Sequence, residues 1–177
     1  MRLLPVLGVT VATVGLAVAP AYASTITGTA GDDTLTGTAT ADVISGLGGS
    51  DIVRAGGGND TVSGGSGRDI LYGELGADHI SGGLGSDRLF GGAGNDTLTD
   101  TQTKVVDLLR GGAGNDVIHG NYRDRIYGGT GNDRITVAFP GIMTIDCGPG
   151  RDTVIFNQRH PHVLLLHCET VRIVSAG

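Results

Sequence analysis

The sequence predicts an all-β protein, a solenoid of nine-residue repeats, and three observations support this prediction. Of the 177 residues, 33 are Gly, none is Trp and only 4% are aromatic, which leaves too little bulk for a conventional globular core. Asp recurs at a fixed interval of nine residues, and such a short period is typical of repeat architectures: Asp33, Asp42, Asp51, Asp60, Asp69, Asp78, Asp87 and Asp96. An aliphatic residue stands two places after each of them: Leu35, Ile44, Val53, Val62, Leu71, Ile80, Leu89 and Leu98.

Each unit joins a Gly-rich half to a short apolar half, as residues 64 to 72 illustrate. Gly permits the positive φ of tight turns and the close approach of backbone carbonyls, so we expect the first four positions to form a turn. The last three positions are expected to form a strand whose middle, aliphatic side chain points inward. Stacked units then pair their strands about 4.8 Å apart.

The first 23 residues differ from the rest of the chain. Arg2 is followed by an apolar run over residues 3 to 19 and then by Ala21, Tyr22 and Ala23, which form an A-x-A cleavage signal. This pattern predicts a secretory signal peptide, residues 1–23, that is removed before Ser24. Gly and Pro interrupt the apolar run and no positive charge follows it, which disfavours a retained membrane anchor. We therefore expect a secreted, extracellular protein with no stable membrane span after cleavage.

The repeats are predicted to fill residues 24–136, followed by a degenerate repeat and a terminal cap over residues 137–177. The array falters between Asp100 and Arg110, where the Gly turn is missing although Asp107 and Leu109 keep the frame. It resumes at Gly111, and residues 147 to 155 form the last unit that can be counted. The end of a solenoid exposes unpaired strand edges, so a cap is expected there.

The repeated residues resemble the RTX (repeats-in-toxin) nonapeptide, G-G-x-G-x-D-x-U-x, over about residues 28 to 155. The resemblance implies a parallel β-roll, a β-solenoid with two nine-residue half-turns per coil, in which calcium is held between the Gly-rich turns. The stretch around Cys147 and Cys168 is similar to the ending of small secreted actinobacterial calcium-binding repeat proteins.

The Asp residues suit calcium, because Ca²⁺ takes six to eight oxygen ligands and a short carboxylate can turn back toward its own loop. One loop does not supply them all, so Asp residues 18 apart, such as Asp51 and Asp69, are expected to share an ion. Stacked Asp rows repel one another without a cation, so we expect a loose or unfolded calcium-free state. Thr40 replaces a Gly of the Asp42 unit, which therefore departs from the motif. The predicted ligands of several Ca²⁺ ions are Asp33, Asp42, Asp51, Asp60, Asp69, Asp78, Asp87, Asp96, Asp116 and Asp133.

Cys147 and Cys168 are the only two cysteines, and both lie in the C-terminal part of the chain. An even pair in a secreted chain predicts one disulfide, which would close the cap. A zinc or redox site is the alternative, although no C-x-x-C spacing is present. A transition-metal site at His160, His162 and His167 is a further alternative.

We expect a binding or structural module rather than an enzyme, because the sequence contains neither G-x-S-x-G nor H-E-x-x-H. The absence of a basic tract disfavours nucleic acid as a partner. The last position of alternate units presents Arg54, Tyr72 and Phe90, either as a face for a cell-surface protein or glycan or as cross-strand support of a thin sheet. A calcium-dependent adhesin, an ice-binding solenoid and a secreted enzyme with an unrecognised site remain as alternatives.

Overall fold

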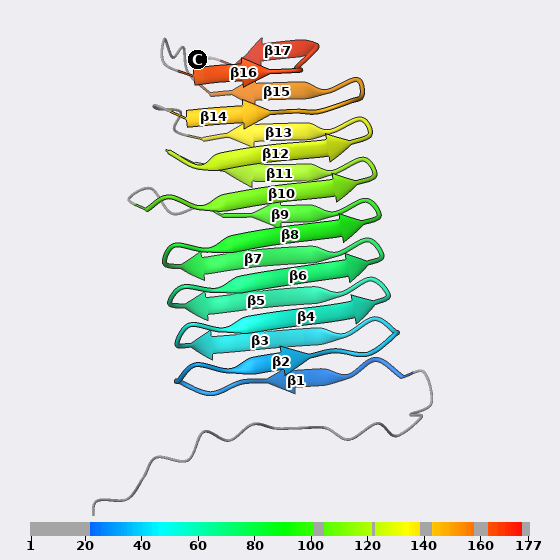
Figure 1. Ribbon diagram of the computed structural model, residues 1–177, viewed down its shortest axis with the longest axis vertical. Helices are drawn as coiled ribbons and strands as arrows, with labels where there is room; N and C mark the ends of the chain where they lie inside the picture. Colours follow the sequence, from blue (N-terminus) through cyan, green and yellow to red (C-terminus); the bar gives the residue numbers. More distant parts are fainter. Residues whose placement is uncertain (1–21, 101–104, 122, 139–142, 158–162, 175–177) are drawn as a thin grey trace, which may run out of the picture.

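The computed structural model describes residues 22–100, 105–121, 123–138, 143–157 and 163–174, and it confirms the all-β parallel solenoid. Successive strands alternate between two sheets, so that each coil of the chain adds one strand to each of the two sheets (Figure 1). Strands that are neighbours within a sheet run parallel. None of the described segments is a helix of the length and hydrophobicity that a membrane crossing needs.

The strands of odd number form one sheet and those of even number form the other, here called the odd sheet and the even sheet. In the described residues the odd sheet consists of β1 (Thr25–Thr27), β3 (Val43–Gly48), β5 (Thr61–Ser66), β7 (His79–Leu84), β9 (Thr97–Thr99), β11 (Val117–Gly120), β13 (Arg134–Val137), β15 (Thr153–Phe156) and β17 (Thr170–Ile173). The even sheet consists of β2 (Thr34–Thr36), β4 (Ile52–Gly57), β6 (Ile70–Leu75), β8 (Arg88–Ala93), β10 (Leu108–Ala113), β12 (Arg125–Thr130), β14 (Met143–Asp146) and β16 (Val163–Leu166).

Most strands are longer than the three residues that the sequence predicts. In β5 the strand continues through Gly64, Gly65 and Ser66, which are the first three positions of the next unit. Gly65 is in register with Leu47 on one side and Gly83 on the other, so inter-coil pairing extends into the Gly-rich half. The expectation that the first four positions form a turn was therefore wrong for the units that follow six-residue strands, where the bend is confined to the fourth to sixth positions.

Aliphatic side chains from the strands of both sheets fill the space between the sheets. Every inward aliphatic position expected from the repeat is buried: Leu35, Ile44, Val53, Val62, Leu71, Ile80, Leu89, Leu98, Leu109, Ile118, Ile126, Ile135 and Val154. The irregular segment after Asp100 does not exchange the sheets, because Arg110 pairs with Phe90 before it and with Tyr127 after it. The fold therefore holds each repeated position at the same place in every coil.

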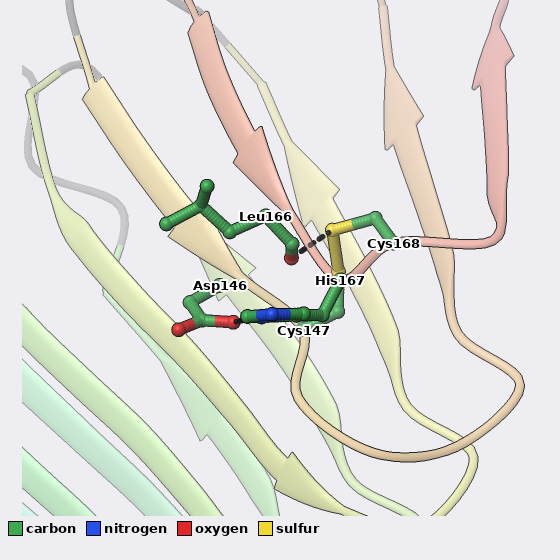
Figure 2. Close-up of polar contacts among 5 residues, drawn as sticks. All are labelled: Asp146, Cys147, Leu166, His167 and Cys168. Carbon is green, nitrogen blue, oxygen red and sulfur yellow. Dashed lines mark hydrogen bonds and ion pairs between the residues drawn. A yellow bond between two sulfur atoms is a disulfide. The ribbon is translucent and has the colours of Figure 1, made fainter.

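The C-terminal strands β14 to β17 continue both sheets beyond the regular repeats. The predicted disulfide is confirmed: Cys147 and Cys168 are bonded, with their Cα atoms 5.2 Å apart, and the bond links successive coils (Figure 2). Hydrophobic side chains on the final strands, such as Leu164 and Ile173, are exposed. Of the predicted signal peptide, residues 1–21 lie outside the described residues.

Candidate metal centre

The Asp residues of the repeat form two ladders, one along each edge of the solenoid. In every rung, one carboxylate oxygen, Oδ1, accepts a hydrogen bond from the backbone N–H of the Asp one coil earlier, at 2.7 to 3.2 Å. Ladder I, at the turns that enter the even sheet, consists of Asp33, Asp51, Asp69, Asp87, Asp107 and Asp124. Ladder II, at the turns that enter the odd sheet, consists of Asp42, Asp60, Asp78, Asp96, Asp116, Asp133, Asp152 and finally Glu169.

The second carboxylate oxygen, Oδ2, is buried and has no hydrogen-bond partner in most rungs. A buried polar atom without a partner is unfavourable, and such atoms are rare in native proteins. Ten ladder residues share this property: Asp51, Asp60, Asp69, Asp78, Asp87, Asp96, Asp107, Asp116, Asp133 and Asp152. A row of anionic oxygens that lack a donor calls for either a proton or a bound cation.

A backbone carbonyl oxygen from the next coil faces each of these sites in the regular units. A Cβ atom placed on Gly64 would lie closer than 3.0 Å both to Asp69 Oδ2 and to the carbonyl oxygen of Gly82. The carboxylate and the carbonyl therefore converge on one small space that only a residue with little or no side chain leaves open. Carboxylate and carbonyl oxygens are the types of ligand that Ca²⁺ prefers.

We call a rung open if the Oδ2 atom of its Asp has no hydrogen-bond partner, and closed if a backbone N–H donates to that atom. The residue at the second position of the unit distinguishes the two kinds. Where Oδ2 lacks a partner and the position is described, this residue has positive φ, even when it is Leu47 (75°) or Glu74 (74°). Residues other than Gly rarely adopt such φ values, because the backbone is strained there. Residues in this conformation are concentrated at functional sites. In the closed rungs the backbone N–H of this residue donates to Oδ2 instead: Thr29 to Asp33, Thr38 to Asp42 and Asn121 to Asp124.

The predicted ligands therefore fall into two groups. Asp33 and Asp42 receive a second hydrogen bond, from the hydroxyl of Thr29 or Thr38, each at 2.9 Å. These two residues stay predicted ligands, but donors already occupy their Oδ2 atoms. The other predicted ligands have a buried Oδ2 with no donor: Asp51, Asp60, Asp69, Asp78, Asp87, Asp96, Asp116 and Asp133.

Burial also changes the titration of the ladder carboxylates. Desolvation, opposed by the backbone N–H bond and reinforced by neighbouring carboxylates, raises the pKa of Asp60 and Asp69 from 3.8 to about 6. The same causes raise the pKa of Asp116 to about 7. Without a cation these groups therefore hold protons at a higher pH than ordinary carboxyl groups do. A bound divalent cation has the opposite effect, because it favours the ionised carboxylate.

Four acidic residues belong to the ladders but were not among the predicted ligands: Asp107, Asp124, Asp152 and Glu169. Asp107, Asp124 and Asp152 follow the pattern of the repeat, since an aliphatic residue stands two places after each of them. Glu169 was overlooked because no Gly precedes it, although Val171 follows two places later, as the repeat requires. Its Oε2 accepts the backbone N–H of Asp152 at 2.8 Å and so ends ladder II.

The candidate partner face forms a continuous row on the even sheet. The guanidinium carbon of Arg54 lies 4.6 Å from the ring centre of Tyr72, and the rings of Tyr72 and Phe90 are stacked at 4.9 Å. Arg54 also pairs with Glu74 at 3.4 Å. These side chains thus contact one another along the sheet, as expected for cross-strand support.

Of the three histidines considered as metal ligands, His160 and His162 lie outside the described residues. His167 Nδ1 lies 2.8 Å from Asp146 Oδ1 (Figure 2), and this contact raises the pKa of His167. Both cysteines are in the disulfide, so they do not form the alternative zinc or redox site.

Comparison with protein families agrees with the two ladders. A family model described as the RTX calcium-binding nonapeptide repeat, in four copies, matches residues 27–62, 63–98 and 106–135, more than half of the chain. The chain belongs to this family. No curated protein matches the sequence. The RTX match ends before Asp152 and Glu169, yet the structure extends the RTX-type ladder through both of them.

Proposed function

We propose that the protein is a calcium-folded RTX module, in which Ca²⁺ ions lie between coils and stabilise the β-roll. The observation that carries the proposal is the row of buried Oδ2 atoms without a hydrogen-bond donor, each beside the carbonyl of the following coil in the regular units. The ion supplies positive charge to these oxygens. The residues that hold it are the ten open-rung Asp residues together with the first-position carbonyls.

The same geometry supports a folding role for the ion. One aliphatic side chain per nine residues provides little hydrophobic stabilisation, while each coil adds two more carboxylates to stacked rows. Because neighbouring carboxylates repel in a partly desolvated environment, the roll needs either protons or cations to be stable. Metal binding is then coupled to folding, as in other small domains whose ligand sites exist only in the folded state.

Circular dichroism of the purified protein, titrated with Ca²⁺ from a chelated start, tests this function. We expect a cooperative gain of β signal with Ca²⁺ and a much smaller response to Mg²⁺, which demands a smaller and more regular site. Equilibrium dialysis would report several bound ions, and Asp69→Asn would lower that number. A chain that is fully folded in chelator at neutral pH and binds no Ca²⁺ would overturn the proposal.

We also propose that the protein acts outside the cell, which the predicted signal peptide supports. Extracellular calcium is abundant, so weak sites are filled there without a dedicated transport step. Expression in a secreting host followed by N-terminal sequencing tests this location. A mature chain that begins at Ser24 in the medium is expected, and retention of the uncut chain in the cell contradicts it.

Adhesion is a second candidate role, favoured by the continuous Arg and aromatic row on the even sheet. Arg and aromatic side chains are enriched where proteins bind partners. Replacing both Tyr72 and Phe90 by Ser is expected to abolish calcium-dependent binding to cell-envelope preparations while the calcium-bound fold persists. Unchanged binding would restrict the row to its structural role.

A further inference from the structure

Where the repeat is interrupted, one additional carboxylate, that of Asp100, lies beside the ladder I residues Asp87 and Asp107. The interval between ladder residues grows to 20 from Asp87 to Asp107, where it is 18 earlier in the chain. A Cβ atom on Gly82 would lie closer than 3.0 Å to both Asp87 Oδ2 and Asp100 Oδ2. At the equivalent Gly64 and Gly91, the second atom is a backbone carbonyl oxygen of the next coil. Asp100 thus places a charged carboxylate where the regular units place a neutral carbonyl.

The resulting cluster is compact and buried. Asp87, Asp100 and Asp107 each offer a carboxylate oxygen, all within 4.8 Å of one another, and none of the three residues is more than 2% exposed. Oδ2 of Asp87 and of Asp107 has no hydrogen-bond partner. The backbone N–H of Asp100 donates to the carbonyl oxygen of His119 at 2.9 Å, which anchors Asp100 beside the ladder. No ion pair with Asp87 or Asp107 occurs within the described residues.

We propose that Asp87, Asp100 and Asp107 form a tricarboxylate cation site that differs from the regular sites and fills before them. The inference rests on the proposed calcium function. Affinity of oxygen sites for Ca²⁺ rises with the number of charged ligands, and this site has the carboxylate of Asp100 in the place where a regular site has a neutral carbonyl. The site therefore takes hard cations of high charge, Ca²⁺ and trivalent lanthanides.

The separation of the oxygen atoms suits a Ca²⁺ ion. Ligands on opposite sides of a Ca²⁺ ion are about 5 Å apart. The three carboxylate oxygens lie within 4.8 Å of one another, so a single Ca²⁺ ion can contact all three. Trivalent lanthanides resemble Ca²⁺ in size and preference for oxygen, so they serve as probes whose binding is stronger at the more highly charged site.

Isothermal titration of the purified protein with Tb³⁺ and with Ca²⁺ tests the site. The variant is Asp100→Asn, which keeps the shape of the side chain and removes its charge. Its matched control is Asp32→Asn. Asp32 Oδ1 accepts the N–H of Ser50. In another unit, the amide oxygen of Asn59 accepts the N–H of Ala77 in the same way, so Asn can replace Asp32 without loss of this bond. Both variants lose one negative charge, but only one of them changes the cluster.

We expect wild type and Asp32→Asn to show one tight binding event followed by weaker ones. Asp100→Asn should lose this first event or weaken it at least tenfold, and it should retain the weaker ones. Superimposable isotherms for all three proteins, each with several bound ions, would overturn the tricarboxylate site and leave the proposed function intact. An absence of Ca²⁺ binding in all three would overturn the proposed function as well.

A measurement on the wild-type protein covers the case in which Asp100→Asn fails to fold. One equivalent of Eu³⁺ is added, and its luminescence lifetime is compared in H₂O and D₂O to count the water molecules on the bound ion. A buried site with three carboxylates predicts few waters on the first ion. A first ion that carries as many waters as the ions bound later would contradict the proposal.

Discussion

The second residue of each RTX unit determines whether its Asp has an oxygen available for a cation. Thr29 and Thr38 donate their backbone N–H groups to Oδ2 of Asp33 and Asp42, whereas Leu47 and Glu74 have positive φ and do not. Two residues with full side chains are thus held in a backbone region that usually belongs to Gly. This strain is understandable if bound ions compensate for it.

Replacing Thr38 by Gly is expected to open the rung of Asp42. Gly tolerates positive φ, and the carbonyl oxygen of Ala55 already lies beside Asp42 Oδ2 near Gly37. We predict that Thr38→Gly binds one more Ca²⁺ than wild type, as counted by equilibrium dialysis. Thr40→Gly is the control, because it adds similar backbone freedom without removing a bond to Asp42. An unchanged number of ions in Thr38→Gly would contradict this account.

The Gly residues of the repeat are expected to differ in how much their replacement lowers the unfolding free energy. At the fourth position Gly67 has a φ of 137°, and a Cβ there would overlap the carbonyl oxygen of Gly49. Around Gly57 the nearest atom to such a Cβ lies at 3.6 Å, an ordinary contact. We predict that Gly67→Ala lowers the unfolding free energy by about 1–3 kcal/mol, while Gly57→Ala changes it by less than about 1 kcal/mol. Urea unfolding in saturating Ca²⁺ measures both, and equal effects would contradict the prediction.

Among the elements, the disulfide joins the residues that follow β14 and β16 and lies close to one of the last open rungs. Cys147 is the first residue of its unit, and its carbonyl oxygen converges with Asp133 Oδ2 on Gly128. We predict that Cys147→Ser combined with Cys168→Ser lowers the unfolding free energy by roughly 3 kcal/mol, the loop-closure value, and weakens Ca²⁺ binding in the last coils. Thermal unfolding and dialysis measure these effects. Reduced and alkylated wild type should behave like the double variant, and an unaltered ion count in both would contradict the link.

The length of the strands shows where sequence reasoning succeeds and where it does not. The period of nine predicts the inward aliphatics, the 18-residue ladder pairs and the register of Arg54 with Tyr72, since each follows from position alone. It does not predict that Gly65 continues β5, because this depends on pairing with Leu47 in another coil. Glycine by itself favours a turn, and the neighbouring coil overrides that preference.

The tricarboxylate cluster could not be predicted for a related reason. Asp100 keeps the frame of nine and occupies the first position of its unit, where Gly82 and Gly91 stand in earlier units. The frame gives this location, but it does not show that a carboxylate at a Gly position turns toward Asp87 and Asp107. Glu169 was easier to predict from the sequence, since Val171 follows it at the expected spacing. It was missed as a ladder residue because it is Glu rather than Asp and because no Gly precedes it.

For the whole molecule, the two ladders predict an unusual dependence of stability on pH. Burial raises the pKa of Asp60 and Asp69 to about 6 and that of Asp116 to about 7, against 3.8 for the unshifted group. Each of these groups therefore binds a proton more tightly in the folded roll. Their stabilising effect is complete below about pH 3.8 and is lost as the pH rises through 6 to 7.

We predict that in chelator the melting temperature of the protein falls between pH 5 and pH 8. In saturating Ca²⁺ this trend should be reversed, because the ions replace protons on the carboxylates. Thermal unfolding followed by circular dichroism at several pH values measures both curves. Calcium-free protein whose stability rises with pH over this interval would contradict the raised pKa values.

The coil-by-coil stacking also has a mechanical consequence. Each coil contacts chiefly the coils before and after it, so a pulling force on the two ends should peel coils away one after another. A coil of 18 residues, the spacing of the ladder, lengthens the chain by about 60 Å when it straightens. The final coil is exempt, because the bond between Cys147 and Cys168 spans 21 residues and keeps that segment closed under load. Because bound Ca²⁺ is proposed to stabilise the contacts between coils, the force at which each coil unfolds should rise with the calcium concentration.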